Sequence, residues 1–125
     1  MTWRRREEIL VFLVALHSLA IGLLLVFATS WGTRFAGWPQ VLPLFFPRQG
    51  GAFHFVVAAG YWMEYRRHRT VSLLLVAKAI ATVFLVAAAV LEPGAWSVPL
   101  SAAADAGMGA LVWGVHRKAV RESVG

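Results

Sequence analysis

Four long apolar stretches, separated by arginine clusters or by proline-containing segments, constrain the fold of this chain more than any other feature. They cover about residues 8–30, 47–65, 70–91 and 98–116. Each is close to the ~20 residues that an α-helix needs to cross the hydrocarbon core of a bilayer. The pattern predicts an all-α integral membrane protein, folded as an up-down bundle of four transmembrane helices.

The composition leaves little sequence for a soluble domain. Of the 125 residues, 59% are hydrophobic and only 14% are charged, whereas a typical soluble domain is nearer half apolar and one quarter charged. We therefore expect a single transmembrane domain that spans residues 1–125. The chain has no cysteine, which excludes thiolate metal sites and thiol–disulfide chemistry.

The basic residues predict the orientation in the membrane. Nine of the twelve lysines and arginines lie at three helix ends, in the groups Arg4–Arg6, Arg66–Arg69 and Arg117–Arg121, and the other connections hold only Arg34 and Arg48. By the positive-inside rule both termini face the cytoplasm, and we expect a multi-pass protein of the bacterial cytoplasmic membrane. Despite the net charge of +6 we expect no nucleic-acid binding, because the charges form no single broad face.

The connections between the predicted helices differ in character. The first, Ser30 to Arg48, contains three prolines and several aromatic residues, which is typical of an interfacial, partly re-entrant loop that caps one end of a bundle. The short polar connection from Arg66 to Thr70 predicts that the second and third helices form an antiparallel hairpin. Ser97 is the expected N-cap of the fourth helix.

One ionisable residue interrupts each apolar stretch: His17, His54, Lys78 and Asp105. Each lies about 9–12 residues from the nearest basic flank, which corresponds to roughly 14–18 Å at ~1.5 Å rise per helical residue. That depth is near the middle of a hydrocarbon core about 30 Å thick. Ionisable groups at this depth are costly and usually face the interior of a bundle, so the four residues predict an intramembrane polar site.

Lys78 and Asp105 are the expected ion pair of this layer, because an unpaired charge at the centre of a span costs ~2.5–3.5 kcal/mol. The pair is either a lock that fixes helix packing or a charged group that binds a ligand or exchanges a proton. His17 is most simply a neutral histidine hydrogen-bonded across a helix interface. In a sharper alternative, Asp105 holds its imidazole in one tautomer and makes it a proton acceptor inside the membrane.

His54 shares a helical face with Ala58, Tyr61 and Tyr65. Such a stripe is typical of the wall of a hydrated cleft, and it makes Tyr61 a further candidate site residue. A cytoplasmic aromatic belt is the alternative explanation, and it accounts for Tyr65.

Two cofactor alternatives use the same polar layer. His17 and His54 lie at matching depth, which permits bis-histidine ligation of haem b. Together with Asp105 they have the ligand types of a zinc site, although no zinc spacing signature is present. We predict no cofactor and no metal. No motif for hydrolysis, phosphate binding or zinc proteolysis occurs, so no catalytic residue is assigned.

Three features of the polar residues accompany the four-helix layout. A lysine lies within the third predicted helix (Lys78), an aspartate within the fourth (Asp105), and the second begins with Arg48-Gln49-Gly50-Gly51. In these features and in length the chain resembles the DoxX-like family of small four-helix bacterial membrane proteins. The resemblance implies a four-helix membrane fold with both termini inside. Some members are accessory subunits of quinone-linked oxidoreductases, which implies a membrane-protein partner.

These observations favour a non-enzymatic membrane protein that binds a small molecule or lipid, or that serves as an accessory subunit of a membrane complex. A proton-linked transporter of small solutes is the first alternative, and a haem- or quinone-associated redox subunit is the second. Small-residue faces at Ser18/Gly22 and Ala103/Gly107 predict helix contacts within the bundle or in a homodimer. Besides the lipid bilayer, the expected partners are therefore another membrane protein or a second copy of the chain.

Overall fold

The computed structural model describes residues 1–125 and contains five α-helices. They are α1 (Trp3–Phe27), α2 (Thr29–Phe35), α3 (Phe45–His68), α4 (Ser72–Leu91) and α5 (Ser97–Val124). Three of them, α1, α4 and α5, are long and apolar enough to cross a membrane. The predicted all-α architecture is confirmed. Helix α3 is also long, but polar and charged residues occupy both of its ends, so it is not among the three.

The helix boundaries differ from the predicted ones mainly at the ends. Helix α1 begins at Trp3, not near residue 8, because the Thr2 side chain accepts a hydrogen bond from the backbone N–H of Arg5 and caps the helix. Helix α5 continues to Val124, beyond the predicted end near residue 116. The prediction that Ser97 caps this helix is wrong, since Ser97 is its first helical residue and no side chain caps it.

The segment predicted as an interfacial loop contains the short helix α2. This helix occupies the residues before the first proline, where every backbone N–H is free to form a helical hydrogen bond. The hydroxyls of Thr29 and Thr33 donate to carbonyls one turn earlier. Trp31 and Phe35 are exposed and stack with their ring centroids 5.3 Å apart. Trp96 Nε1 donates to the Phe35 carbonyl at 2.9 Å, which ties α2 to the α4–α5 connection.

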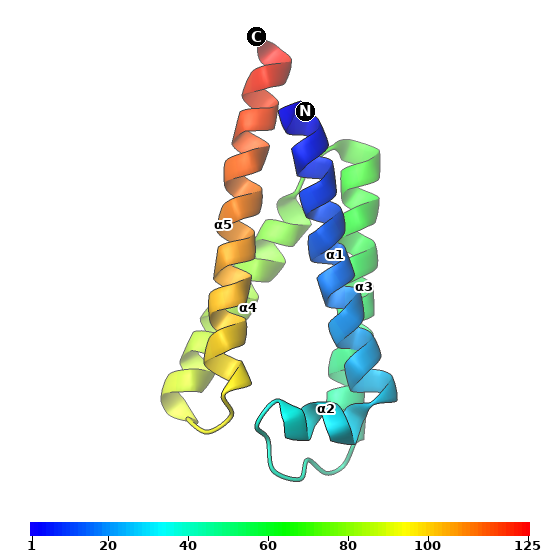
Figure 1. Ribbon diagram of the computed structural model, residues 1–125, viewed down its shortest axis with the longest axis vertical. Coiled ribbons are helices and arrows are strands. Elements are labelled where there is room, and N and C mark those ends of the chain that lie inside the picture. Colours follow the sequence, from blue (N-terminus) through cyan, green and yellow to red (C-terminus); the bar gives the residue numbers. More distant parts are fainter.

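The four long helices form two closely packed pairs (Figure 1). Helix α1 packs along α3, α4 packs along α5, and α1 also contacts α5. Both chain termini and the α3–α4 turn lie at one end, which we call the termini side, and α2 lies at the opposite end, the α2 side. The predicted α3–α4 hairpin is opened into a V, because these two helices contact each other far less than the members of either pair.

Two glycines bring α1 and α3 into backbone contact. A Cβ atom built on Gly51 would lie 2.9 Å from the carbonyl oxygen of Gly22, and one built on Gly22 would lie 2.9 Å from the carbonyl oxygen of Gly51. Only glycine permits such an approach without moving a helix. The small-residue face expected at Ser18 and Gly22 therefore serves a contact within the chain.

The largest buried cluster of apolar side chains lies toward the termini side. Its largest fully buried members are Tyr65, Leu74, Val11 and Val112. Toward the α2 side the two helix pairs diverge (Figure 1), and apolar side chains such as Phe84 and Leu91 are largely exposed. Extended exposed apolar surface is typical of a face that contacts lipid. One end of the molecule is thus tightly packed and the other is open.

The glycine contact yields a testable prediction. Gly51→Ala is expected to destabilise the protein by about 1–3 kcal/mol, because the added methyl group meets the backbone of α1 and cannot be accommodated by a side-chain rotation. Unfolding of the detergent-solubilised protein, followed by circular dichroism, measures the loss. Gly50→Ala is the matched control, since nothing lies within 4 Å of a Cβ built there. Equal stability of the two variants would contradict the close approach of α1 and α3.

Candidate functional site

An ion pair between α4 and α5 is the centre of the candidate site. Lys78 Nζ lies 2.7 Å from Asp105 Oδ1, and the two side chains are 7% and 14% exposed. The pairing expected from the sequence is therefore present. Each charge neutralises the other in surroundings where an unpaired charge would be strongly destabilising.

A glycine on α5 lets Lys78 reach this position. A Cβ built on Gly109 would lie 3.3 Å from the Lys78 Cβ, so the lysine stem runs close to the bare α5 backbone. Gly109 follows Asp105 by one helical turn, which places the lysine stem and the carboxylate on the same face of α5. The Lys78 carbonyl accepts a hydrogen bond from the Thr82 hydroxyl at 2.7 Å, so this hydroxyl is satisfied within α4.

A cavity of about 380 Å³, which we call the α2-side cavity, lies between the two helix pairs. Three predicted site residues from three helices line it: His17, His54 and Asp105. The rest of its lining is largely apolar and includes Ile21, Leu24, Phe35, Leu85, Trp96 and Leu100. A molecule in this cavity would contact mainly apolar side chains, together with the three predicted residues and the hydroxyls of Ser97 and Ser101.

A second cavity of about 190 Å³, which we call the α3–α4 cavity, is lined mainly by those two helices. Lys78 and Tyr61 line it, and it shares His54 and Asp105 with the α2-side cavity. The predicted residues are therefore gathered around two adjoining cavities, with His54 and Asp105 common to both. His17 lines only the α2-side cavity, and Lys78 lines only the α3–α4 cavity.

The zinc alternative lacks a matching geometry. No three histidine, aspartate or glutamate side chains of the chain are grouped in a way that could hold a metal ion. His17, His54 and Asp105 line one cavity, but they do not form such a group.

Two buried polar atoms beside these cavities have no hydrogen-bond partner within the protein. They are the Ser18 hydroxyl and His54 Nδ1. Ser18 is only 1% exposed, and both residues line the α3–α4 cavity. Buried polar side-chain atoms nearly always have a partner. These two atoms are exceptions, and because neither has accessible surface, a polar group in that cavity would reach them only after a side-chain rotation.

On the outer surface, α4 and α5 leave a groove of about 350 Å³ beside the same ion pair. Small residues line much of it, among them Ala79, Ala106 and Gly109, and Lys78 and Asp105 line it as well. Asp105 therefore borders three hollows, two between the helix pairs and one on the outside. Its side chain is nevertheless only 14% exposed, whereas His17 is the exposed residue of the polar layer.

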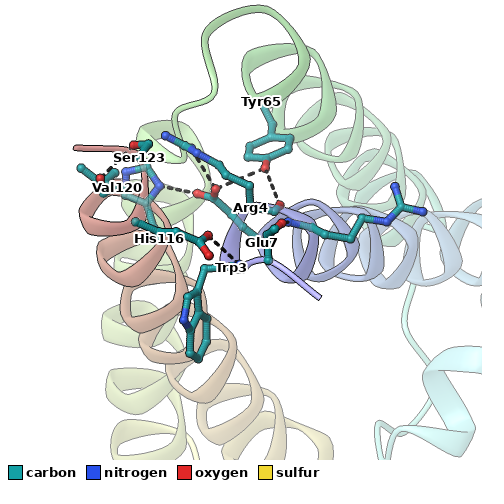
Figure 2. A network of polar contacts seen from close by, with 10 residues as sticks. Trp3, Arg4, Glu7, Tyr65, His116, Val120 and Ser123 are labelled. Atoms are coloured by element: carbon teal, nitrogen blue, oxygen red, sulfur yellow. Dashed lines mark hydrogen bonds and ion pairs between the residues drawn. The ribbon is translucent and has the colours of Figure 1, made fainter. Parts of the chain in front are cut away.

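A second polar cluster, on the termini side, was not expected from the sequence (Figure 2). Glu7 is 1% exposed, and its Oε2 accepts hydrogen bonds from Arg4 Nη1 at 3.0 Å and from the Tyr65 hydroxyl at 3.2 Å. His116 Nδ1 contacts the other carboxylate oxygen. One carboxylate thus joins α1, α3 and α5 beside the largest apolar cluster.

Glu7 carries a sequence signal that hydropathy alone obscures. It stands among arginines at the end of an apolar stretch, where an exposed ion pair is the usual arrangement. However, Glu7 precedes Val11 and Val14 at helical spacing, and all three are buried on the same face of α1. This periodicity places Glu7 toward the protein interior. No local pattern pairs it with His116, which lies near the other end of the chain.

No protein-family model, curated protein or solved structure matches this chain. The resemblance to DoxX-like proteins therefore remains a prediction from the helix layout and from a few residues. The function has to be inferred from the geometry of the site itself.

The Lys78–Asp105 pair makes a prediction about stability. Lys78→Met and Asp105→Asn should each destabilise the protein, by about 3–5 kcal/mol, because each leaves one buried charge without its partner. The double variant should recover most of this loss. Unfolding titrations of the wild type and the three variants in detergent measure the coupling free energy. Strictly additive losses would indicate that the pair does not hold α4 against α5.

The Glu7 cluster makes a second prediction about stability. Glu7→Ala should lower the free energy of unfolding by about 2–4 kcal/mol, because Arg4 and His116 lose their shared carboxylate. Glu8→Ala is the matched control, since Glu8 is partly exposed and lies 3.6 and 3.7 Å from two arginines. Its removal should cost less than about 1 kcal/mol. Chemical unfolding measures the free energy of unfolding of both variants. Similar losses in the two would contradict the special role of the buried Glu7 carboxylate.

Proposed function

We propose that this chain is a multi-pass protein of a bacterial cytoplasmic membrane in which α1, α3, α4 and α5 cross the bilayer as a four-helix bundle. Three of these helices have the required length and composition, and α3, with 24 residues, runs along α1. Exposed apolar side chains on all four helices support their contact with lipid. The arginine groups at the termini side support a cytoplasmic location of both ends.

Within this bundle, the α2-side cavity binds a small amphipathic molecule, and the role of the chain is binding and not catalysis. The observation that carries this proposal is a largely apolar cavity lining that also contains the ionisable residues His17, His54 and Asp105, with the hydroxyls of Ser97 and Ser101 as the other polar groups. Small-molecule sites are typically apolar clefts of roughly 300–1,000 Å³ with a few polar groups that fix orientation. The volume of about 380 Å³ lies within that range.

The polar groups of the lining favour a ligand without a strong net charge. The carboxylate of Asp105 is already neutralised by Lys78 at 2.7 Å, and neutral imidazoles offer one donor and one acceptor each. A carbonyl or hydroxyl group on an otherwise apolar body would satisfy these atoms without bringing an unpaired charge into the bilayer. The same site would suit an accessory subunit that supplies such a molecule to a membrane complex.

Proton-linked transport is a second candidate, and the unequal packing of the two ends favours it. The α2-side cavity lies where the helix pairs diverge, whereas the apolar cluster and Glu7 close the termini side. A transporter alternates the access of one central site between the two sides of the membrane. In this scheme the structure corresponds to the form open to the α2 side, and Asp105 carries the proton.

Filling the α2-side cavity tests the binding proposal. Ala104 lines this cavity, so Ala104→Trp should reduce the amount of a co-purifying small molecule by about tenfold or more, which corresponds to ~1.4 kcal/mol of binding free energy. Ala103→Trp is the matched control, because Ala103 is the preceding residue of α5 and is exposed outside the cavities described. Mass spectrometry of organic extracts of the purified proteins measures the bound molecule.

The outcomes separate the two candidates. Equal amounts of the co-purifying molecule in extracts of wild type, Ala104→Trp and Ala103→Trp would contradict binding in the cavity. If the identified molecule accumulates in proteoliposomes under a pH gradient, and Asp105→Asn abolishes this accumulation while the variant still binds it, transport is the function. Binding without accumulation by the wild type would leave the chain a binding protein.

A further inference from the structure

We propose that a cup of arginines on the termini side binds a phosphate-bearing anion, either the headgroup of an anionic lipid or free phosphate. The cup is a surface hollow of about 430 Å³ lined by Thr2, Arg4, Arg5, Glu8 and Arg69. No hydrophobic residue lines it, in contrast to the two cavities and the outer groove. It is separate from the ligand cavity, and only the lipid form of the proposal depends on the membrane placement proposed above.

The lining of the cup carries an excess of positive charge. Three arginines and one glutamate give a formal charge of 3 − 1 = +2. Arg4 and Arg5 come from the first turn of α1, and Arg69 is the residue that follows α3, so two separate segments bring these charges together. Glu7 pairs with Arg4 at 3.0 Å, and Glu8 pairs with Arg5 at 3.6 Å. Arg69 is therefore the arginine of the cup that has no carboxylate partner. An anion in the cup would supply the missing partner of Arg69. The planar fork of a guanidinium group matches the oxygens of a phosphate group particularly well.

The backbone of Arg69 has a conformation that is unusual for a residue other than glycine. Arg69 has φ 54°, and it is the only residue other than glycine with a positive φ. Its N–H donates to the Tyr65 carbonyl at 2.9 Å and ends α3. Glycine is the usual residue in such a left-handed helix cap, because a Cβ atom is strained there. Backbone strain of this kind tends to persist where a residue has a function.

Tyr65 contacts the guanidinium of one arginine of the cup and the backbone of another. The Arg69 guanidinium lies over the ring of Tyr65, 5.2 Å from the ring centroid, and it has no carboxylate within 4.0 Å. The Tyr65 hydroxyl donates to the Arg4 carbonyl at 3.4 Å and to Glu7 at 3.2 Å. Tyr65 is fully buried. The cup is therefore built on a rigid support, which lowers the entropic cost of ordering its side chains around an anion.

The position of the cup fits a phosphate at a membrane surface. It lies at the end of the molecule that holds the arginine groups, beside the N-terminus of α1. Anionic lipid headgroups concentrate at the cytoplasmic face of a membrane and are attracted by basic side chains next to it. A soluble phosphate compound offers the same oxygens, so the shared chemistry is the phosphate group.

Arg69→Gly tests the proposal, because glycine adopts the required backbone conformation while the whole arginine side chain, with its guanidinium, is removed. Arg67→Ala is the matched control, since it removes the same charge from an exposed position outside the cup. In one arm, native mass spectrometry counts phosphatidylglycerol retained by the full chain from mixed nanodiscs of phosphatidylglycerol and phosphatidylcholine. In the other, inorganic phosphate is titrated into phosphatidylcholine nanodiscs, with chloride at equal ionic strength, and thermal unfolding is followed.

Wild type and Arg67→Ala should bind, and Arg69→Gly should lose about tenfold or more in affinity, as expected for removal of a charge-assisted hydrogen bond. A response to phosphatidylglycerol alone assigns a lipid headgroup, and a response to inorganic phosphate assigns a free anion. Equal binding by the two variants, or no binding by the wild type, would overturn the proposal. Ala104→Trp should leave this binding unchanged, so failure of the cup and failure of the ligand cavity are distinguishable.

Discussion

The pairing of Lys78 with Asp105 is the constraint on which much of the molecule depends. Neither charge can be buried alone at tolerable cost, so α4 and α5 have to present these two residues to each other. Gly109 makes this possible by leaving room for the lysine stem along α5. Because the pair is neutral as a whole, the polar layer can border cavities that are otherwise apolar.

The two ends of the molecule differ in how tightly the helices pack and in which polar groups lie between them. On the termini side the Glu7 carboxylate and the apolar cluster hold three helices together. On the α2 side the helix pairs diverge and leave a largely apolar cavity that three ionisable residues also line. The arginine cup lies beyond the tight end, where charges from α1 and from the end of α3 meet. Arg4 belongs to both the Glu7 cluster and the cup.

Much of the fold and part of the site followed from local properties of the chain. Hydropathy located the long helices, with errors of about five residues at the start of α1 and about eight at the end of α5, where polar residues continue the helices beyond the apolar stretches. The energetic cost of a buried charge was enough to predict the Lys78–Asp105 pair. The V shape of α3 and α4 was missed, because a short connection constrains the ends of two helices and not their crossing angle. The helix α2 was not predicted, because prolines and aromatic residues in the same segment are typical of a loop and this helix has only seven residues.

The sequence by itself determined the all-α character of the chain, the approximate helices and the residues that carry charge into apolar segments, since each of these depends on neighbours within a few turns. Only the tertiary structure decided that α1 pairs with α3, that Glu7 meets His116, and that His17, His54 and Asp105 surround one cavity. These contacts join residues far apart in the chain. They depend on close steric fits such as that of Gly22 with Gly51, which no periodicity within a single helix encodes.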